Sequence, residues 1–345
     1  MPKNIVIFSD GTGQKGGVGS NTNVYKLFNM IEDRTNRQIA FYDSGLGTDW
    51  KRVTGAIAGR GFSKNILDCY RFLFNNFEAG DQIFLFGFSR GAATVRSLSA
   101  FVHLFGILPK CRSDLIDKAF SIYKIKDKDK RKASAETLIN KHHTMWTKIK
   151  FLGVWDTVAA LGLPGKFVSV ALDRVFAHKF HNFKLSESVE FARQALSIDE
   201  ERKTFTPILW ENISIEDKMK QVWFCGVHTD VGGGYKEQDL SNISLKWMIR
   251  EAIAKNLIIY SKSEDYKILM DSDVNVNGTM HNEQKGFPGN LFKRKAREWV
   301  KKTHGEPCVH HTVLDRTKNN DNLDDPGYTS LILNSIDKTY PNIEQ

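Results

Sequence analysis

The amino-acid sequence predicts an α/β fold: a mostly parallel central sheet with helices on both faces and additional helical insertions. Short apolar runs typical of buried strands recur along the chain, at residues 3–9, 38–42, 81–86, 148–155 and 221–227. Several of these runs end in glycine-bearing loops, and parallel sheets place their ligand sites at such strand ends. Between the runs lie stretches with apolar side chains at helical spacing, residues 62–78 being an example.

The run at 81–86 continues directly into G-F-S-R-G at residues 87–91 and then into a helical stretch, residues 92–101. A strand that turns into a helix through G-x-S-x-G is the nucleophile elbow of α/β-hydrolases. The turn strains the backbone of Ser89 and leaves no room for side chains at the flanking glycines. We therefore predict an α/β-hydrolase-like core with Ser89 as nucleophile. The alternative is that this glycine- and serine-containing turn is purely structural and has no catalytic role.

Two later strand-like runs end in residues that complement a serine nucleophile. The run at 148–155 leads to Asp156, and the run at 221–227 leads to His228, which T-D-V-G-G-G-Y follows. The chain order serine, carboxylate, histidine matches that of α/β-hydrolase triads. We predict that Ser89, Asp156 and His228 form a catalytic triad. Asp199 remains a second candidate for the acid, and His310 a second candidate for the base.

Backbone N–H groups are the expected donors to the developing oxyanion. The helix that starts after Ser89 presents the N–H of Arg90, and the glycine-bearing loop after the first strand presents those near Gly11 and Thr12. A phosphate loop is the competing interpretation of that glycine-rich segment. It is rejected because the sequence lacks G-K-[ST].

Composition is ordinary for a globular protein, with 41% hydrophobic and 26% charged residues among 345. The net charge of +9 favours an anionic membrane surface, or solubility alone, over a nucleic acid, for which no motif is present. No apolar run approaches the roughly 20 residues of a membrane span, and no signal peptide is recognisable. We expect a cytoplasmic chain, with signal-less export left open. Four scattered cysteines indicate reduced thiols, and neither a metal nor a cofactor is expected.

For domain organisation we predict a core over residues 1–260, with helical insertions at 109–148 and 163–205. Residues 261–345 are expected to be a C-terminal extension packed on the core. This extension contains L-F-K-R-K-A-R-E-W-V-K-K at residues 291–302, a basic stretch with interleaved apolar side chains. Segments that lie on a membrane surface have this pattern, and a solvated surface helix fits it equally.

Five strings together resemble the α/β-hydrolase domain shared by the first family of type VI secretion lipase effectors and their relatives. They are F-S-D-G-T (8–12), Y-D-S-G-L-G-T (42–48), G-F-S-R-G-A (87–92), G-V-W-D-T-V (153–158) and G-V-H-T-D-V-G-G-G-Y (226–235). The similarity runs from about residue 4 to 240 and more thinly to His310. It implies a serine esterase that acts on phospholipid acyl esters, with phospholipase A activity as in the characterised effectors.

The sequence therefore predicts a serine hydrolase that cleaves carboxylic esters through an acyl-enzyme, with a phospholipid or another acyl ester as substrate. A phospholipase A-type lipid esterase is the preferred form of this hypothesis. A soluble carboxylesterase with a non-phospholipid substrate is one alternative. A hydrolase fold that only binds is another, and the complete set Ser89, Asp156 and His228 argues against it.

Overall fold

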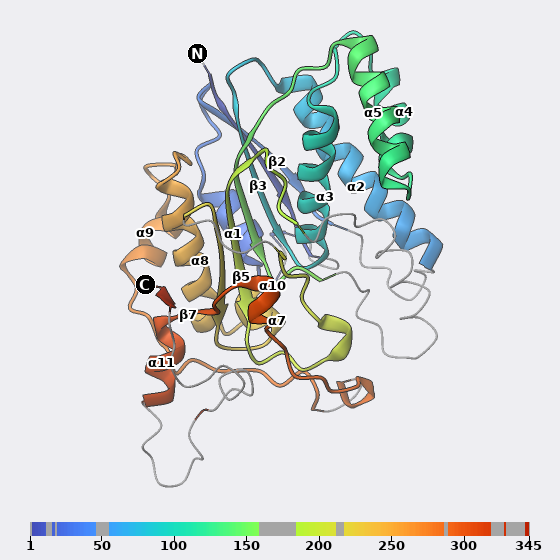
Figure 1. The fold of residues 1–345 in the computed structure, drawn as a ribbon. Coiled ribbons are helices and arrows are strands. Elements are labelled where there is room, and N and C mark those ends of the chain that lie inside the picture. The colour runs from blue at the N-terminus through green and yellow to red at the C-terminus, as the bar shows by residue number, and fades with distance from the viewer. Residues whose placement is uncertain are drawn as a thin grey trace.

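The computed structural model describes most of the chain and places its elements around one sheet (Figure 1). The described residues are 2–11, 16–17, 19–45, 55–158, 184–211, 217–285, 289–318, 328 and 342–344. No helix among these residues is both long enough and apolar enough to cross a membrane.

The sheet has eight strands, and every neighbouring pair is parallel. In spatial order the strands are β2 (Gln38–Asp43), β1 (Asn4–Ser9), β3 (Gln82–Phe88), β4 (Ile149–Trp155), β5 (Val189–Ser197), β6 (Met219–Phe224), β7 (Cys308–His310) and β8 (Asn342–Glu344). The central strands β1, β3 and β4 are almost entirely buried, because helices cover both faces of a parallel sheet. The predicted fold class is confirmed.

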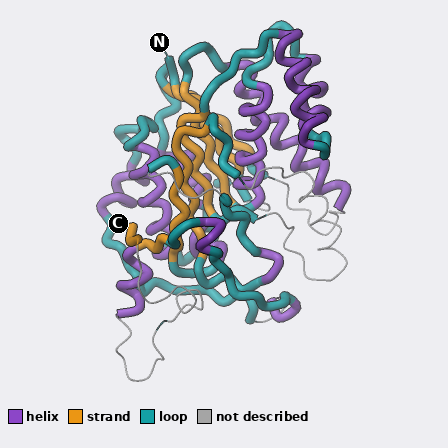
Figure 2. Tube along the Cα trace, in the orientation of Figure 1, coloured by secondary structure: helices purple, strands orange, loops and turns teal. Residues whose placement is uncertain are grey.

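Helices pack on both faces of the sheet (Figures 1 and 2). One face carries α2 (Gly55–Asn76), α3 (Arg90–Phe105), α4 (Asp114–Tyr123) and α5 (Lys128–His142), and the other carries α1 (Asn23–Met30), α8 (Asp239–Ile253) and α9 (Glu264–Asp271). Alternation along β1 divides its side chains between two apolar clusters. Ile5 and Ile7 pack under α2 and α3, whereas Val6 and Phe8 pack under α1 and α8.

Shorter helices gather where the strands end: η2 (Lys203–Phe205), α7 (His228–Gly232), η3 (Gly289–Leu291), α10 (Lys301–His304) and α11 (His311–Lys318). In Figure 1, α7 and α10 lie at the lower end of the sheet, opposite the end at which the N-terminus enters β1. This lower end is the carboxyl edge of the strands, where α/β proteins place their sites.

The structure corrects one of the two predicted insertions. Range 109–148 does contain two helices, α4 and α5, but range 163–205 includes the sheet strand β5. Residues 163–183 of that range lie outside the described part of the chain. The strand was missed because Arg193 and Gln194 interrupt its apolar pattern. Both side chains are buried and satisfied, Arg193 by Glu251 and Gln194 by the side chain of Gln221.

The predicted core boundary at residue 260 is also too early. Strands β7 and β8 belong to the C-terminal range 261–345, and they extend the same sheet beyond β6. Each has only three residues, which is too short for a periodic pattern to reveal a strand in the sequence.

Candidate active site

Ser89 lies at the turn between β3 and α3, with a left-handed backbone (φ 58°) that L-residues rarely adopt. Its N–H donates to the carbonyl oxygen of Trp155 at 3.0 Å, which ties the turn to the end of the neighbouring strand β4. The predicted nucleophile elbow is present: the strand ends, the next residue is strained, and the helix begins at Arg90.

The two glycines of the elbow are required by close backbone approaches. A Cβ at Gly87 would lie 2.6 Å from the carbonyl oxygen of Gly91, and one at Gly91 would lie 1.9 Å from the carbonyl oxygen of Ser9. Real Cβ atoms do not occur at such separations, so a side chain at either position would force strand and helix apart.

We expect Gly91→Ala to lower the free energy of unfolding by about 3 kcal/mol, because the new methyl group meets backbone atoms that cannot rotate away. Urea unfolding followed by circular dichroism measures this. Gly19→Ala is the matched control. A Cβ at Gly19 would have no neighbour within 4 Å among the described residues, and the positive φ of 73° should cost about 1 kcal/mol. A Gly91→Ala chain as stable as the control would contradict the close approach to β1.

Three side chains meet at the carboxyl ends of β3, β4 and β6. Ser89 Oγ lies 2.9 Å from His228 Nε2, and His228 Nδ1 lies 2.5 Å from Asp156 Oδ2. Asp156 directly follows β4, and His228 is the first residue of α7. All three are buried, Asp156 completely. The structure thus brings together the three residues that the sequence predicted as a triad.

Two phenyl rings pack against the His228 imidazole. The ring centroid of Phe88 lies 4.6 Å from that of His228, and Phe205 of η2 approaches edge-on at 5.0 Å. Packing of this kind restricts the rotamer of the histidine, whose residue is 4% exposed. The imidazole is therefore held where it can bridge the hydroxyl and the carboxylate.

Asp156 has a second, stronger set of partners. Arg297 donates from Nη1 to Asp156 Oδ1 at 2.5 Å and from Nη2 to Oδ2 at 2.8 Å, and the N–H of Ser197 donates to Oδ1 at 3.1 Å. Burial by itself would raise the pKa of Asp156. The charge and hydrogen bonds of Arg297, with the hydrogen bond from His228, outweigh it and hold that pKa far below its usual value.

The ionised carboxylate fixes the histidine tautomer. An ionised Asp156 can only accept hydrogen bonds, so the proton shared with it belongs to His228 Nδ1. His228 Nε2 is then unprotonated and accepts the hydrogen bond from the Ser89 hydroxyl. This is the arrangement in which histidine can remove the serine proton.

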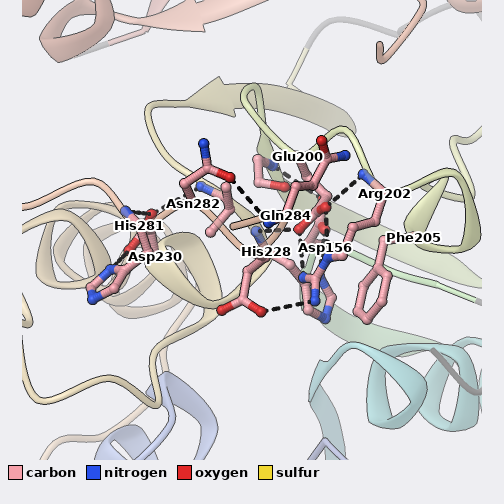
Figure 3. Close-up of polar contacts among 12 residues, drawn as sticks. Asp156, Glu200, Arg202, Phe205, His228, Asp230, His281, Asn282 and Gln284 are labelled. Carbon is pink, nitrogen blue, oxygen red and sulfur yellow. Dashed lines mark hydrogen bonds and ion pairs between the residues drawn. The ribbon is translucent and has the colours of Figure 1, made fainter. Parts of the chain in front are cut away.

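Sequence reasoning did not find Arg297, Glu200 or Arg202 as site residues. Figure 3 shows Glu200 and Arg202 beside Asp156 and His228, with Phe205 at the edge of the group. Glu200 and Arg202 form a buried, two-pronged ion pair at 2.7 and 2.8 Å. Arg297 lies within the basic run 291–302, where no local signal distinguishes a buried arginine from its exposed neighbours.

The N–H groups predicted to bind the oxyanion differ in whether they are free to do so. Arg90 is the first residue of α3, and an N–H at that position has no acceptor within its helix. Gly11 is a correction: its N–H donates to Asp10 Oδ1 at 2.6 Å and is already occupied. Thr12 lies outside the described residues. The other oxygen of Asp10, Oδ2, accepts the hydroxyl groups of Thr22 and Tyr42, and burial raises the pKa of Asp10 to about 6.

Asp199 and His310, the alternative acid and base, have other partners. Asp199 accepts the N–H of Gly226 at 2.7 Å and the hydroxyl of Tyr328 at 2.8 Å. His310 Nδ1 lies 2.8 Å from Thr312 Oγ1, and burial lowers the pKa of His310 to about 3. Both side chains therefore serve local structure in the described part of the chain, and the triad forms without them.

The parallel sheet, the elbow and the serine–histidine–aspartate contact define an α/β-hydrolase-type domain. A sequence model of the type VI secretion phospholipase effector Tle1-like catalytic domain matches residues 3–251. The chain belongs to this family, a family of ester hydrolases, which confirms the resemblance noted in the sequence.

Individual relatives are more distant. An uncharacterized protein of Saccharomyces cerevisiae is 28% identical over 253 residues, which are 66% of this chain and 36% of that protein. Among solved structures, an uncharacterized protein from Pseudomonas aeruginosa is 16% identical, with a TM-score of 0.44, over 75% of this chain and 46% of the other. A structure of the Tle1 effector bound to the VgrG spike is 19% identical, with a TM-score of 0.38, over 68% of this chain and 52% of the other. The chain thus spans about a third to a half of these relatives.

Proposed function

We propose that this chain is a serine hydrolase that cleaves carboxylic ester bonds of phospholipids. The observation that carries the proposal is the contact series from Ser89 Oγ to His228 and on to Asp156, 2.9 and 2.5 Å long, at the strained elbow. A structural serine has no need of a strained backbone, a hydrogen-bonded imidazole and a buried carboxylate at once.

The mechanism follows from these contacts. Ser89 Oγ attacks the ester carbonyl carbon while its proton passes to His228 Nε2, and the N–H of Arg90 stabilises the resulting oxyanion. His228 then donates the proton to the leaving alkoxide, which departs and leaves an acyl group on Ser89. A water molecule, deprotonated by His228, hydrolyses this ester and regenerates the serine. Asp156 keeps the imidazole in the required tautomer throughout.

Phospholipid is the proposed substrate for two reasons besides the family. The net charge of +9 attracts a protein to anionic lipid surfaces. Arg90, next to Ser89, has no hydrogen-bond or ion-pair partner for its guanidinium within the described residues, and burial lowers its pKa to about 10. A lipid phosphate close to the reacting ester would supply the missing anion.

The test uses the unaltered protein. A fluorophosphonate probe should form one adduct, mapped by tandem mass spectrometry to Ser89. The labelled protein should lose hydrolysis of phosphatidylcholine vesicles containing phosphatidylglycerol. Absence of an adduct at Ser89 would overturn the serine mechanism. An adduct with hydrolysis of short soluble esters, and none of vesicles, would replace phospholipid by a soluble acyl ester.

A further inference from the structure

The Asp156 carboxylate is held by a residue from outside the range that matches the family. Arg297 lies beyond residue 251, yet it forms a two-pronged ion pair with Asp156 deep in the site. We propose that Arg297 is a positioning residue of the proposed hydrolase, which acts on catalysis through Asp156 and sets the pH at which the Asp156–His228 pair becomes protonated. The inference rests on the proposed function for its meaning in catalysis.

The segment that carries Arg297 is fixed in place by its backbone. The N–H of Lys203 donates to the carbonyl oxygen of Lys293 at 2.9 Å, and the N–H of Lys295 donates to that of Glu201 at 2.7 Å. Arg202 and Arg294 form an antiparallel bridge between these two bonds. Residues 293–297 therefore run along the loop after β5, and this pairing places the Arg297 side chain in the interior.

Once inside, the guanidinium forms four hydrogen bonds with the described residues. Besides its two bonds to Asp156, Arg297 donates from Nε to the carbonyl oxygen of Glu200 at 3.3 Å and from Nη2 to that of Phe205 at 2.9 Å. Its side chain is 1% exposed and that of Asp156 is 0% exposed. A planar fork of this kind holds both carboxylate oxygens, so Asp156 cannot rotate away from His228.

The positive charge has an electrostatic consequence as well. Asp156 Oδ2 accepts from both Arg297 and His228, so the guanidinium competes with a protonated imidazole for the same oxygen. Among the described residues, the other charged groups around this pair are Glu200, which accepts the N–H of His228, then Arg202 and Glu283, which are linked to Glu200 by ion pairs, and Asp230 of α7. Arg202 pairs with both glutamates and His281 pairs with Asp230. Within the described part of the chain, Arg297 is therefore the arginine or lysine in direct contact with Asp156.

We expect Arg297→Gln to lower kcat on the ester substrate about 100-fold with little change in KM, because the carboxylate is no longer held against His228. The acid limb of the kcat/KM profile should move to higher pH by about one unit, since removal of a cation stabilises the protonated pair. Arg297→Lys keeps the charge without the fork, so its acid limb should stay near that of the wild type while kcat remains reduced.

Controls separate positioning from stability. Arg193→Gln removes an equally buried arginine, whose partners are Glu251 and Asp217, and should lower stability without moving the acid limb. In an Asp156→Asn background, Arg297→Gln should cost less than threefold further, because its effect passes through Asp156. An unmoved acid limb in folded Arg297→Gln, or an equal loss in both backgrounds, would overturn the proposal.

One readout does not depend on hydrolysis. The Nδ1 proton of His228, shared with Asp156, should give a downfield proton NMR resonance whose pH midpoint rises by about one unit in Arg297→Gln. If Arg297→Gln is unfolded, the comparison is made with Arg297→Lys, whose midpoint should match the wild type. A wild-type chain that hydrolyses no ester would refute the proposed function. An NMR midpoint that Arg297→Gln leaves unchanged would refute the role of Arg297 instead.

Discussion

Ser89→Ala should reduce kcat by about a millionfold and abolish labelling by fluorophosphonate. The reason is that no other nucleophile occupies the elbow, and removal of the serine also removes the proton that His228 would accept. The substitution deletes one oxygen from a strained position and adds no atoms. The folded structure should therefore persist, and the loss can be measured as turnover of a vesicle substrate at equal concentrations of folded protein.

Ser99→Ala is the matched control for this experiment. Ser99 lies on the same helix, α3, and is buried. Within the described residues its hydroxyl donates to the carbonyl oxygen of Arg96 at 2.8 Å. Its loss should change stability slightly and leave kcat within about twofold of the wild type. If Ser89→Ala turns over substrate as fast as Ser99→Ala, the elbow is a structural turn and Ser89 is not the catalytic nucleophile.

The residues that the sequence revealed are those whose function has a local signature. Ser89 lies between Gly87 and Gly91 because the backbone approaches too closely there for a side chain. A steric requirement of this kind can be recognised from neighbouring residues in the sequence. Asp156 directly follows β4 and His228 comes shortly after β6, so parallel pairing was enough to predict that they lie at one edge of the sheet.

Residues that depend on distant partners could not be predicted in this way. Strand β5 was missed because the partners that satisfy Arg193 and Gln194 come from elsewhere in the chain. Gly11 was predicted to contribute to the oxyanion hole because its loop follows the first strand at the carboxyl edge of the sheet. In the structure its N–H donates to the side chain of Asp10 instead. Arg297 is one of several cations in a basic run, and only tertiary structure makes it a buried partner of Asp156.

Asp156→Asn should lower kcat about ten-thousandfold while Ser89 and His228 remain in place. An amide cannot hold the imidazole in the required tautomer, because its NH₂ group favours a histidine with the proton on Nε2, which then cannot accept from Ser89. The substitution also leaves the Arg297 charge buried without its carboxylate, so we expect a lower melting temperature as well. The activity loss should persist at temperatures well below that transition.

Asp199→Asn distinguishes this role from a general effect of removing a buried carboxylate near the site. Asp199 was the rival acid in the sequence; burial raises its pKa to about 6, and it binds the N–H of Gly226 and the hydroxyl of Tyr328. An amide oxygen can accept the same hydrogen bonds, so kcat should stay within about tenfold of the wild type. Equal losses in the two variants, at equal folded fraction, would remove the assignment of Asp156 as the residue that orients His228. A loss confined to Asp156→Asn would locate the catalytic requirement for a carboxylate at the end of β4.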